Sequence, residues 1–141
     1  YQYMEFVDNW RGLAHEAKAI AGPGDEVLTL ATPFAYYYGP PARAIVDDVH
    51  PPEQLRRLVE GIESERVLLQ YSPLSGWENM DFARLAGLVG EALKRQGYSR
   101  QWVRRYGYDP HADRKRRYLA GRSFPDYRHC LELYTRENGG S

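Results

Sequence analysis

Two short runs of apolar residues, set between amphipathic stretches, constrain the fold of this chain more than any other feature of its sequence. Residues 27–31 (VLTLA) and 67–72 (VLLQYS) are almost uninterrupted apolar runs of strand length. Runs of this kind are typical of strands that helices cover on both faces of a sheet. Apolar residues also recur at helical spacing within residues 10–21, 51–62 and 81–95. Because strands and helices alternate, the sequence predicts an α/β domain.

The predicted architecture is a single three-layer, Rossmann-like domain with a mostly parallel sheet of about four strands and flanking helices. The other two strands are expected at residues 43–49 and 127–134. Asp8 and Asn9 are good capping residues for the first helix, and the GPGD turn at residues 22–25 is expected to end it. A length of 141 residues suits one domain.

Four segments are expected to lack regular structure. Residues 33–41 are predicted to form a loop after the first strand, and residues 72–79 a loop after the third. Residues 99–122 are predicted to be a basic irregular segment. Residues 136–141 are predicted to be a flexible tail.

Charge is balanced over the whole chain but not along it. The 19 basic and 19 acidic residues give a formal net charge of zero, which argues against electrostatic binding of nucleic acid by the whole domain. Residues 1–93 nevertheless carry a net charge of −7, and residues 94–141 carry +7. Such asymmetry marks an interaction surface in some proteins, whereas in others the two halves neutralise each other across the fold. Both interpretations stay open from the sequence.

The motifs that bind nucleotides or carry covalent catalysis are missing from the sequence. It contains no G-x-G-x-x-G or Walker motif, and the GPGD turn at residues 22–25 precedes a strand instead of following one. We therefore expect no cofactor. Ser72 and Ser75 follow a strand, but the sequence identifies no partner for either and contains no G-x-S-x-G motif. His129 and Cys130 are neighbours in a strand, so they are expected to face opposite ways and to form no dyad.

Asp47, Asp48 and His50 are the best local cluster of metal-ligating side chains. They lie at the C-terminal end of a predicted strand, where α/β sheets usually bind ligands. One alternative function, a freestanding small α/β enzyme, depends on this cluster. Consecutive carboxylates point to opposite sides of a strand, however, so we favour a polar strand end and assign no metal. Cys130 is the single cysteine, which excludes a multi-cysteine zinc site.

Aromatic side chains are concentrated in two of the predicted loops. Tyr36, Tyr37 and Tyr38 follow the first strand, and Trp77 follows the third. These loops share one edge of a parallel sheet, and rings with polar tips suit contact with a sugar or a lipid headgroup. The four residues are therefore candidates for substrate binding. The alternative is that tyrosines cap the core, and at least one of the three consecutive tyrosines is expected to point inward.

The basic segment at residues 99–122 is the second candidate binding region. Its arginines alternate with aromatic residues, and Arg114, Arg116 and Arg117 are the candidate contact residues within it. Such a segment suits anionic phosphate groups, whether of a lipid headgroup, a polyprenyl phosphate or a nucleic acid. The second alternative function is therefore a module that binds anionic lipid or nucleic acid. A solvated loop that pairs with the acidic half of the chain explains the same pattern.

Several short motifs together resemble one known family. They are DNWRGLA at residues 8–14, GPGDEV at 22–27, Phe34 with YYY at 36–38, RVLL at 66–69 and YRHCLELY at 127–134. The chain thereby resembles the soluble C-terminal domain of multi-spanning glycosyltransferases that use polyprenyl-phosphate-linked sugars, such as protein mannosyltransferase and aminoarabinose transferase-like enzymes. In that family a Trp-Arg helix leaves the last membrane span, a Pro-Gly-Asp turn starts the first strand, and a short strand closes the domain. The basic segment at residues 99–122 departs from this pattern.

The resemblance implies a domain on the extracytoplasmic face of a membrane, joined to the transmembrane portion of the same polypeptide. The parent enzyme would transfer a sugar from a lipid-phosphate donor to a protein, lipid or glycan acceptor. Its catalytic acid lies in a loop of the membrane portion, so the resemblance implies an accessory role here, in acceptor recognition or packing. No run in this chain approaches the ~18 apolar residues of a membrane span. The chain has no starting Met, begins with YQY and ends with NGGS, so we expect it to be part of a larger protein.

Overall fold

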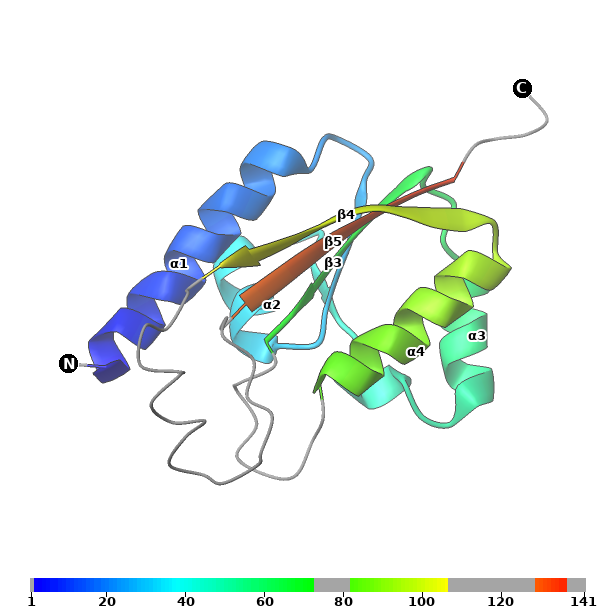
Figure 1. Ribbon diagram of the computed structural model, residues 1–141, viewed down its shortest axis with the longest axis horizontal. Helices are drawn as coiled ribbons and strands as arrows, with labels where there is room; N and C mark the ends of the chain where they lie inside the picture. Colours follow the sequence, from blue (N-terminus) through cyan, green and yellow to red (C-terminus); the bar gives the residue numbers. More distant parts are fainter. Residues whose placement is uncertain (1, 73–81, 107–128, 137–141) are drawn as a thin grey trace.

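The computed structural model describes residues 2–72, 82–106 and 129–136, with side chains from residue 10 onward. Helices and strands alternate along most of the chain (Figure 1). The helices are α1 (Gln2–Ile20), α2 (Thr32–Tyr38), the 3-10 helix η1 (Val46–Asp48), α3 (Pro52–Glu60) and α4 (Phe82–Arg95). The strands are β1 (Glu26–Thr29), β2 (Arg43–Ala44), β3 (Arg66–Tyr71), β4 (Tyr98–Tyr106) and β5 (His129–Arg136).

The strands form one mixed sheet in the order β2-β1-β3-β5-β4. β1 pairs in parallel with β2 and β3, whereas β5 pairs antiparallel with β3 and β4. β3 and β4 therefore point the same way, and β5 lies between them in the opposite direction. The prediction of a mostly parallel sheet is wrong, because β5 pairs antiparallel with both of its neighbours. Five strands lie in the described part of the chain, and the insertion of β5 makes the pairings on its side antiparallel.

One end of the sheet, called the carboxyl side below, is where β1 and β3 finish. β1 ends there at Thr29 and β3 at Tyr71. Tyr71 pairs with Cys130 near the start of β5, and Tyr106 at the end of β4 pairs with His129. The chain therefore leaves β4 and enters β5 on the carboxyl side.

Helix α1 brings its N-terminal half to the same side. The ring of Trp10 contacts that of His129, with 4.5 Å between the centroids. At the other end of the helix, the carbonyl of Ile20 accepts a hydrogen bond from the guanidinium of Arg66, at the start of β3 (3.4 Å). α1 therefore runs antiparallel to β3 along the sheet, as Figure 1 shows.

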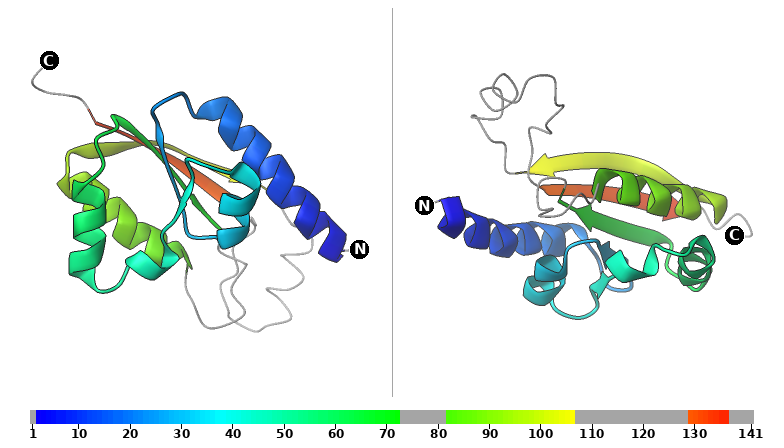
Figure 2. Two further views of the ribbon diagram at one scale, coloured as in Figure 1. Left: turned by 180° about the vertical axis from the view of Figure 1, so that it is seen from behind. Right: turned by 90° about the horizontal axis from the view of Figure 1, so that it is seen from below.

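Helices cover both faces of the sheet (Figure 2). α1 and α2 pack on one face, in a core cluster that includes Leu13, Phe34 and Leu131. α3 and α4 pack on the other face, in a cluster that includes Leu55 and Val89. The prediction of an α/β domain with helices flanking the sheet is confirmed.

The elements with the clearest apolar patterns lie where the sequence predicts them. The run at residues 27–31 contributes β1, and the run at residues 67–72 contributes β3. α3 begins at Pro52, in the first turn of the helix, where the missing N–H of proline costs no hydrogen bond. α4 ends before Gly97, whose φ of +92° suits glycine.

The predicted start of the first helix is wrong. α1 begins at Gln2, so Asp8 and Asn9 lie inside it. No glycine or proline interrupts residues 2–11, and residues of the capping type favour a helix start without enforcing one.

The predicted loop at residues 33–41 is largely a helix, α2. Pro33 lies in its first turn, where its missing N–H costs no hydrogen bond. Gly39, with a φ of +78°, ends the helix, and its N–H donates to the carbonyl of Ala35 (2.9 Å). The three tyrosines therefore belong to a helix and point in different directions around it.

Two strand predictions also need correction. The strand expected at residues 43–49 is limited to β2, and the 3-10 helix η1 follows it. Within the segment predicted to be irregular, residues 99–106 belong to β4. β4 is an edge strand rich in arginine, and charges on an exposed edge conceal the usual alternation of a strand. The rest of that segment, residues 107–122, lies outside the described residues.

The predicted tail begins one residue too early. Arg136 is the last residue of β5, and its N–H donates to the carbonyl of Glu65 (2.8 Å). Its guanidinium lies over the ring of Tyr98 at 4.8 Å. Residues 137–141 lie outside the described residues.

Candidate functional site

A chain of buried polar side chains lies on the carboxyl side, beneath α1. Thr29 ends β1, and its hydroxyl donates to the amide oxygen of Gln70 on β3. The amide nitrogen of Gln70 donates to Ser72 Oγ (2.9 Å), which lies 2.8 Å from His129 Nδ1. Each of these four side chains is at most 2% exposed. The chain therefore crosses β1, β3 and β5 within the core.

The chemistry of the groups fixes the direction of the bond between Gln70 and Ser72. An amide nitrogen only donates, so Ser72 Oγ accepts from Gln70. The direction of the next bond, between Ser72 Oγ and His129 Nδ1, depends on the tautomer of the imidazole. The buried chain thus orients Ser72 and His129 relative to each other.

The pairing of Ser72 with His129 is absent from the sequence prediction. The two residues are 57 positions apart, and only the pairing of β5 with β3 brings them together. The alternation of the last strand does place His129 on the same face as Leu131 and Leu133. The sequence therefore indicates that His129 faces a core, but it does not indicate its partner. With Ser72 1% exposed, the hydroxyl cannot receive a substrate in this arrangement. The geometry supports a stabilising role and no nucleophilic one.

A second buried polar cluster lies on the opposite face, beneath α4. The carboxylate of Glu132 is 5% exposed and accepts hydrogen bonds from Tyr71 (2.6 Å) and Tyr134 (2.7 Å). The guanidinium of Arg100 lies 3.8 Å from the same carboxylate. Burial, and then the bond to Glu132, raises the pKa of Tyr134. Both phenols therefore stay protonated and keep donating to Glu132.

Cys130 lies in the same cluster and is fully buried. Burial raises the pKa of its thiol to about 11. A thiol with so high a pKa stays protonated at neutral pH and does not react as a nucleophile. The orientation of Cys130 toward α4, and of His129 toward α1, confirms that these neighbours form no dyad.

The candidate tyrosines differ widely in exposure because α2 points them in different directions. Tyr36 is 81% exposed, Tyr37 is half-buried and Tyr38 is 8% exposed. The expectation that at least one of them points inward is confirmed by Tyr38, whose pKa burial raises. The rings of Tyr36 and Tyr37 meet edge to face at 5.3 Å, and the guanidinium of Arg11 lies 5.7 Å from the Tyr37 ring.

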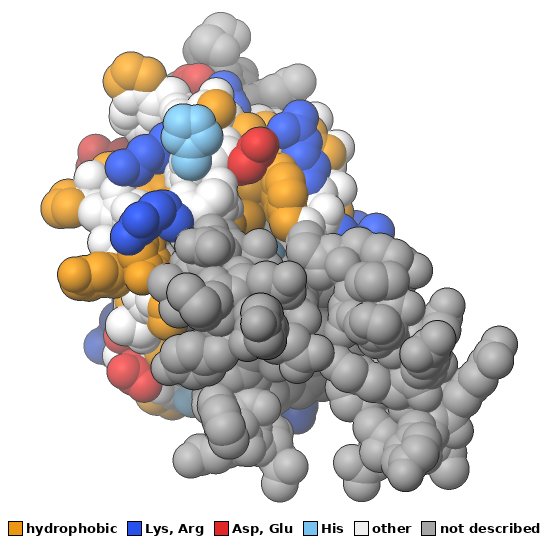
Figure 3. All heavy atoms as spheres, turned by 90° about the vertical axis from the view of Figure 1, so that its left-hand side faces the viewer, with side chains coloured by type: hydrophobic (Ala, Val, Ile, Leu, Met, Phe, Trp, Pro, Cys, Tyr) orange, Lys and Arg blue, Asp and Glu red, His pale blue; other side chains and the backbone are white. Residues whose placement is uncertain are grey.

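Arg11, Tyr36 and Tyr37 therefore form an aromatic and cationic group, called the α1–α2 patch below. Its two helices contribute residues that lie far apart in the sequence. Figure 3 shows one side of the molecule, on which hydrophobic and basic side chains lie next to one another. Rings beside a guanidinium can stack on a sugar and bind an adjacent anion.

The other predicted binding residues are not described by the structure. Trp77, Arg114, Arg116 and Arg117 lie outside the described residues. The described residues that flank their segments include Ser72, Tyr106 and His129, which lie on the carboxyl side. Whether these residues contribute to binding stays a prediction.

The acidic cluster at the end of the second predicted strand is spread over η1 and the turn that follows. Asp47 and His50 are exposed, and Asp48 Oδ1 accepts a hydrogen bond from Gln54 Nε2 (2.8 Å). Among the described residues, no three His, Cys, Asp or Glu side chains are grouped so as to hold a metal ion. The geometry of the described part thus adds nothing in favour of a metal-dependent reaction here.

Within residues 2–72, 82–106 and 129–136, no helix has both the length and the apolar character needed to cross a membrane. Comparisons of the chain with protein-family models, with curated proteins and with solved structures find no match. The geometry and the sequence therefore carry the functional argument.

Proposed function

We propose that this chain is an accessory extracytoplasmic domain of a multi-spanning glycosyltransferase that takes its sugar from a lipid-phosphate donor. Three features that the resemblance implies have counterparts in the fold. Trp10 and Arg11 lie in a long helix, the turn at residues 22–25 leads directly into β1, and β5 is the last strand of the described chain. Within the turn, the N–H of Gly22 donates to the carboxylate of Asp25 (2.8 Å).

The direction of α1 is the observation that carries the proposal. Its N-terminal half lies on the carboxyl side of the sheet, as the contact between Trp10 and His129 requires. If α1 continues from a membrane span, as it does in the family, the carboxyl side faces the transmembrane portion of the same polypeptide. Arg11 and the α1–α2 patch then lie near the membrane portion, which holds the family's catalytic acid.

In this proposal the domain binds and positions a substrate but does not carry out the reaction. The exposed ring of Tyr36 stacks on a glycan or protein acceptor, or on the lipid-linked sugar donor, while Arg11 pairs with an anionic group. The buried polar networks around Ser72 and Glu132 stabilise the fold and do not contact the substrate.

Fractionation of cells that make the protein tests the proposal. An antibody raised against this chain is used to probe blots of membrane and soluble fractions. We expect a band much heavier than 16.3 kDa that only detergent releases. A band near 16.3 kDa in the soluble fraction would overturn the proposal and favour a freestanding enzyme or an independent binding module.

Substitution of Tyr36 in the membrane-bound protein tests the role of the patch. Tyr36→Ala removes an exposed ring, so the fold should be unaffected while sugar transfer falls. Tyr36→Phe keeps the ring for stacking and serves as the matched control. Equal transfer by wild type and Tyr36→Ala would remove the patch from the proposal and leave only a packing role for the domain.

A further inference from the structure

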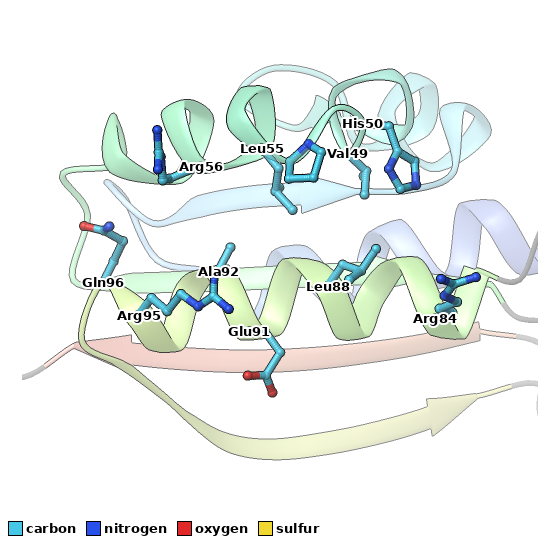
Figure 4. Close-up of a pocket in the computed structure, with 11 residues that line it drawn as sticks. Val49, His50, Leu55, Arg56, Arg84, Leu88, Glu91, Ala92, Arg95 and Gln96 are labelled. Carbon is cyan, nitrogen blue, oxygen red and sulfur yellow. The ribbon is translucent and has the colours of Figure 1, made fainter.

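A groove of about 360 Å³ lies between α3 and α4, on the face of the sheet opposite α1 (Figure 4). Its middle is apolar and is formed by Val49, Leu55, Leu88 and Ala92. Leu88 is 36% exposed, so part of this apolar lining is open to solvent. The volume and apolar lining of the groove are typical of a small-molecule site.

Both ends of this groove carry basic side chains. Figure 4 shows His50 and Arg84 at one end, and Arg56, Arg95 and Gln96 at the other. Arg56 on α3 and Arg95 on α4 both line this end, and a guanidinium can form two parallel hydrogen bonds to a carboxylate or phosphate.

The acidic groups near the groove do not cancel this charge. Glu91 is the one carboxylate among the lining residues of the described chain, and it points away from α3 in Figure 4. Its carboxylate lies 3.7 Å from Lys94 Nζ. Arg56 lies 3.7 Å from Glu60, but both side chains are about half exposed or more, so this ion pair is weak. An anion at this end therefore has little competition.

We propose that the groove between α3 and α4 binds an anionic amphiphile, with its chain on Leu55, Leu88 and Ala92 and its carboxylate or phosphate between Arg56 and Arg95. Leu88 and Arg95 are two turns apart on α4, about 10 Å, so a medium-length alkyl chain spans the apolar middle while its headgroup reaches the arginines. This site lies on the other face from the α1–α2 patch and does not depend on the proposed transferase function.

Titration of the chain with dodecyl phosphate and dodecanoate, below their micelle concentrations, tests the proposal by calorimetry. Leu88→Asp and Arg95→Glu should each weaken binding about tenfold or more. The matched controls are Ala83→Asp and Lys94→Glu, which change neighbouring exposed positions of α4 that do not line the groove. Both controls should bind like wild type. Tighter binding of one probe identifies the headgroup as phosphate or carboxylate.

Absence of saturable binding by both amphiphiles would overturn the proposal. Equal weakening by Arg95→Glu and Lys94→Glu would also overturn it, because it would indicate a general charge effect. Inorganic phosphate that binds as tightly as dodecyl phosphate would contradict a role for the apolar chain. If Leu88→Asp does not fold, Leu88→Ala and the amide shifts of Leu88 and Ala92 in NMR spectra provide the same test.

Discussion

The two faces of the sheet bury polar groups of different kinds. Beneath α1, the neutral side chains of Thr29, Gln70 and Ser72 are joined one to the next and end at the imidazole of His129. Beneath α4, the carboxylate of Glu132 is buried between two phenol groups and a guanidinium. Neighbouring residues of β3 supply both faces, since Gln70 points to α1 and Tyr71 points to α4.

Polar groups that are equally buried therefore differ in how much stability is lost when a partner is removed. A break in the neutral chain leaves one or two groups without a hydrogen bond. Loss of the donors around Glu132 leaves a buried charge, which costs more. The neutral chain lies toward the carboxyl side, whereas the cluster around Glu132 extends along β5 to Tyr134, which pairs with Val67 near the start of β3.

The largest loss is expected when Tyr71 and Tyr134 are both replaced by Phe. Glu132 then stays buried without its two hydroxyl donors, and we expect the free energy of unfolding to fall by about 4 kcal/mol. Urea unfolding followed by circular dichroism measures this change. In a Glu132→Leu background the same two replacements should cost less than about 1 kcal/mol. Equal losses in the two backgrounds would contradict a role for the carboxylate.

High pH should also weaken the α4 face. Burial raises the pKa of the Cys130 thiol from 9.0 to about 11, so between these values the folded chain binds more protons than the unfolded chain. The protonated thiol makes its full contribution to stability below the unfolded pKa of 9.0. The free energy of unfolding then falls as the pH rises to the folded pKa of about 11, by about 2–3 kcal/mol in all.

The raised pKa values of Tyr71 and Tyr134 act in the same direction. Urea unfolding at several pH values between 8 and 11 measures the slope, and Cys130→Ala should make it shallower. An unchanged slope in this variant would show that the thiol has no part in the effect.

Close packing of α4 on the charged cluster is expected to forbid a methyl group at Gly90. A Cβ there would lie 2.5 Å from the hydroxyl of Tyr134, so Gly90→Ala should cost about 2 kcal/mol. Gly87→Ala is the matched control, since nothing lies within 4 Å of its Cβ, and it should stabilise the helix by up to about 1 kcal/mol. Thermal unfolding compares the two. Tyr134→Phe should partly rescue Gly90→Ala, and a lack of rescue would place the clash elsewhere.

The smallest expected effect is a break in the neutral chain beneath α1. Ser72→Ala removes the link between Gln70 and His129, and should lower the free energy of unfolding by about 1–2 kcal/mol. Ser99→Ala, at an exposed position, should change it by less than about 0.5 kcal/mol. A loss for Ser72→Ala as large as that of the double Phe variant would remove the distinction between the two faces.

The sequence predicts the elements whose pattern is local. The apolar run at residues 67–72 is too short and too continuous for a surface helix, and it forms β3. The stripe of α4 repeats over its whole length, so its bounds are nearly as predicted. The sequence does not predict the helix α2, because the prolines around it are more common in turns and loops.

Long-range pairing is what the sequence does not encode locally. Nothing in residues 127–134 indicates that this strand enters between β3 and β4, so the sequence does not predict the mixed sheet. The same pairing creates the contact of Ser72 with His129 and surrounds Glu132 with donors from β3 and β5. The groove between α3 and α4 likewise requires the relative placement of two helices that a sequence pattern does not give.

Thiol labelling in intact cells tests the location of the domain most directly. Ser99 is exposed, whereas Cys130 is buried with a pKa of about 11, so Ser99→Cys adds the reactive thiol to this chain. A membrane-impermeant maleimide is added before and after the cells are broken. An extracytoplasmic domain of a membrane glycosyltransferase is labelled fully before lysis. Labelling that occurs only after lysis would contradict that function.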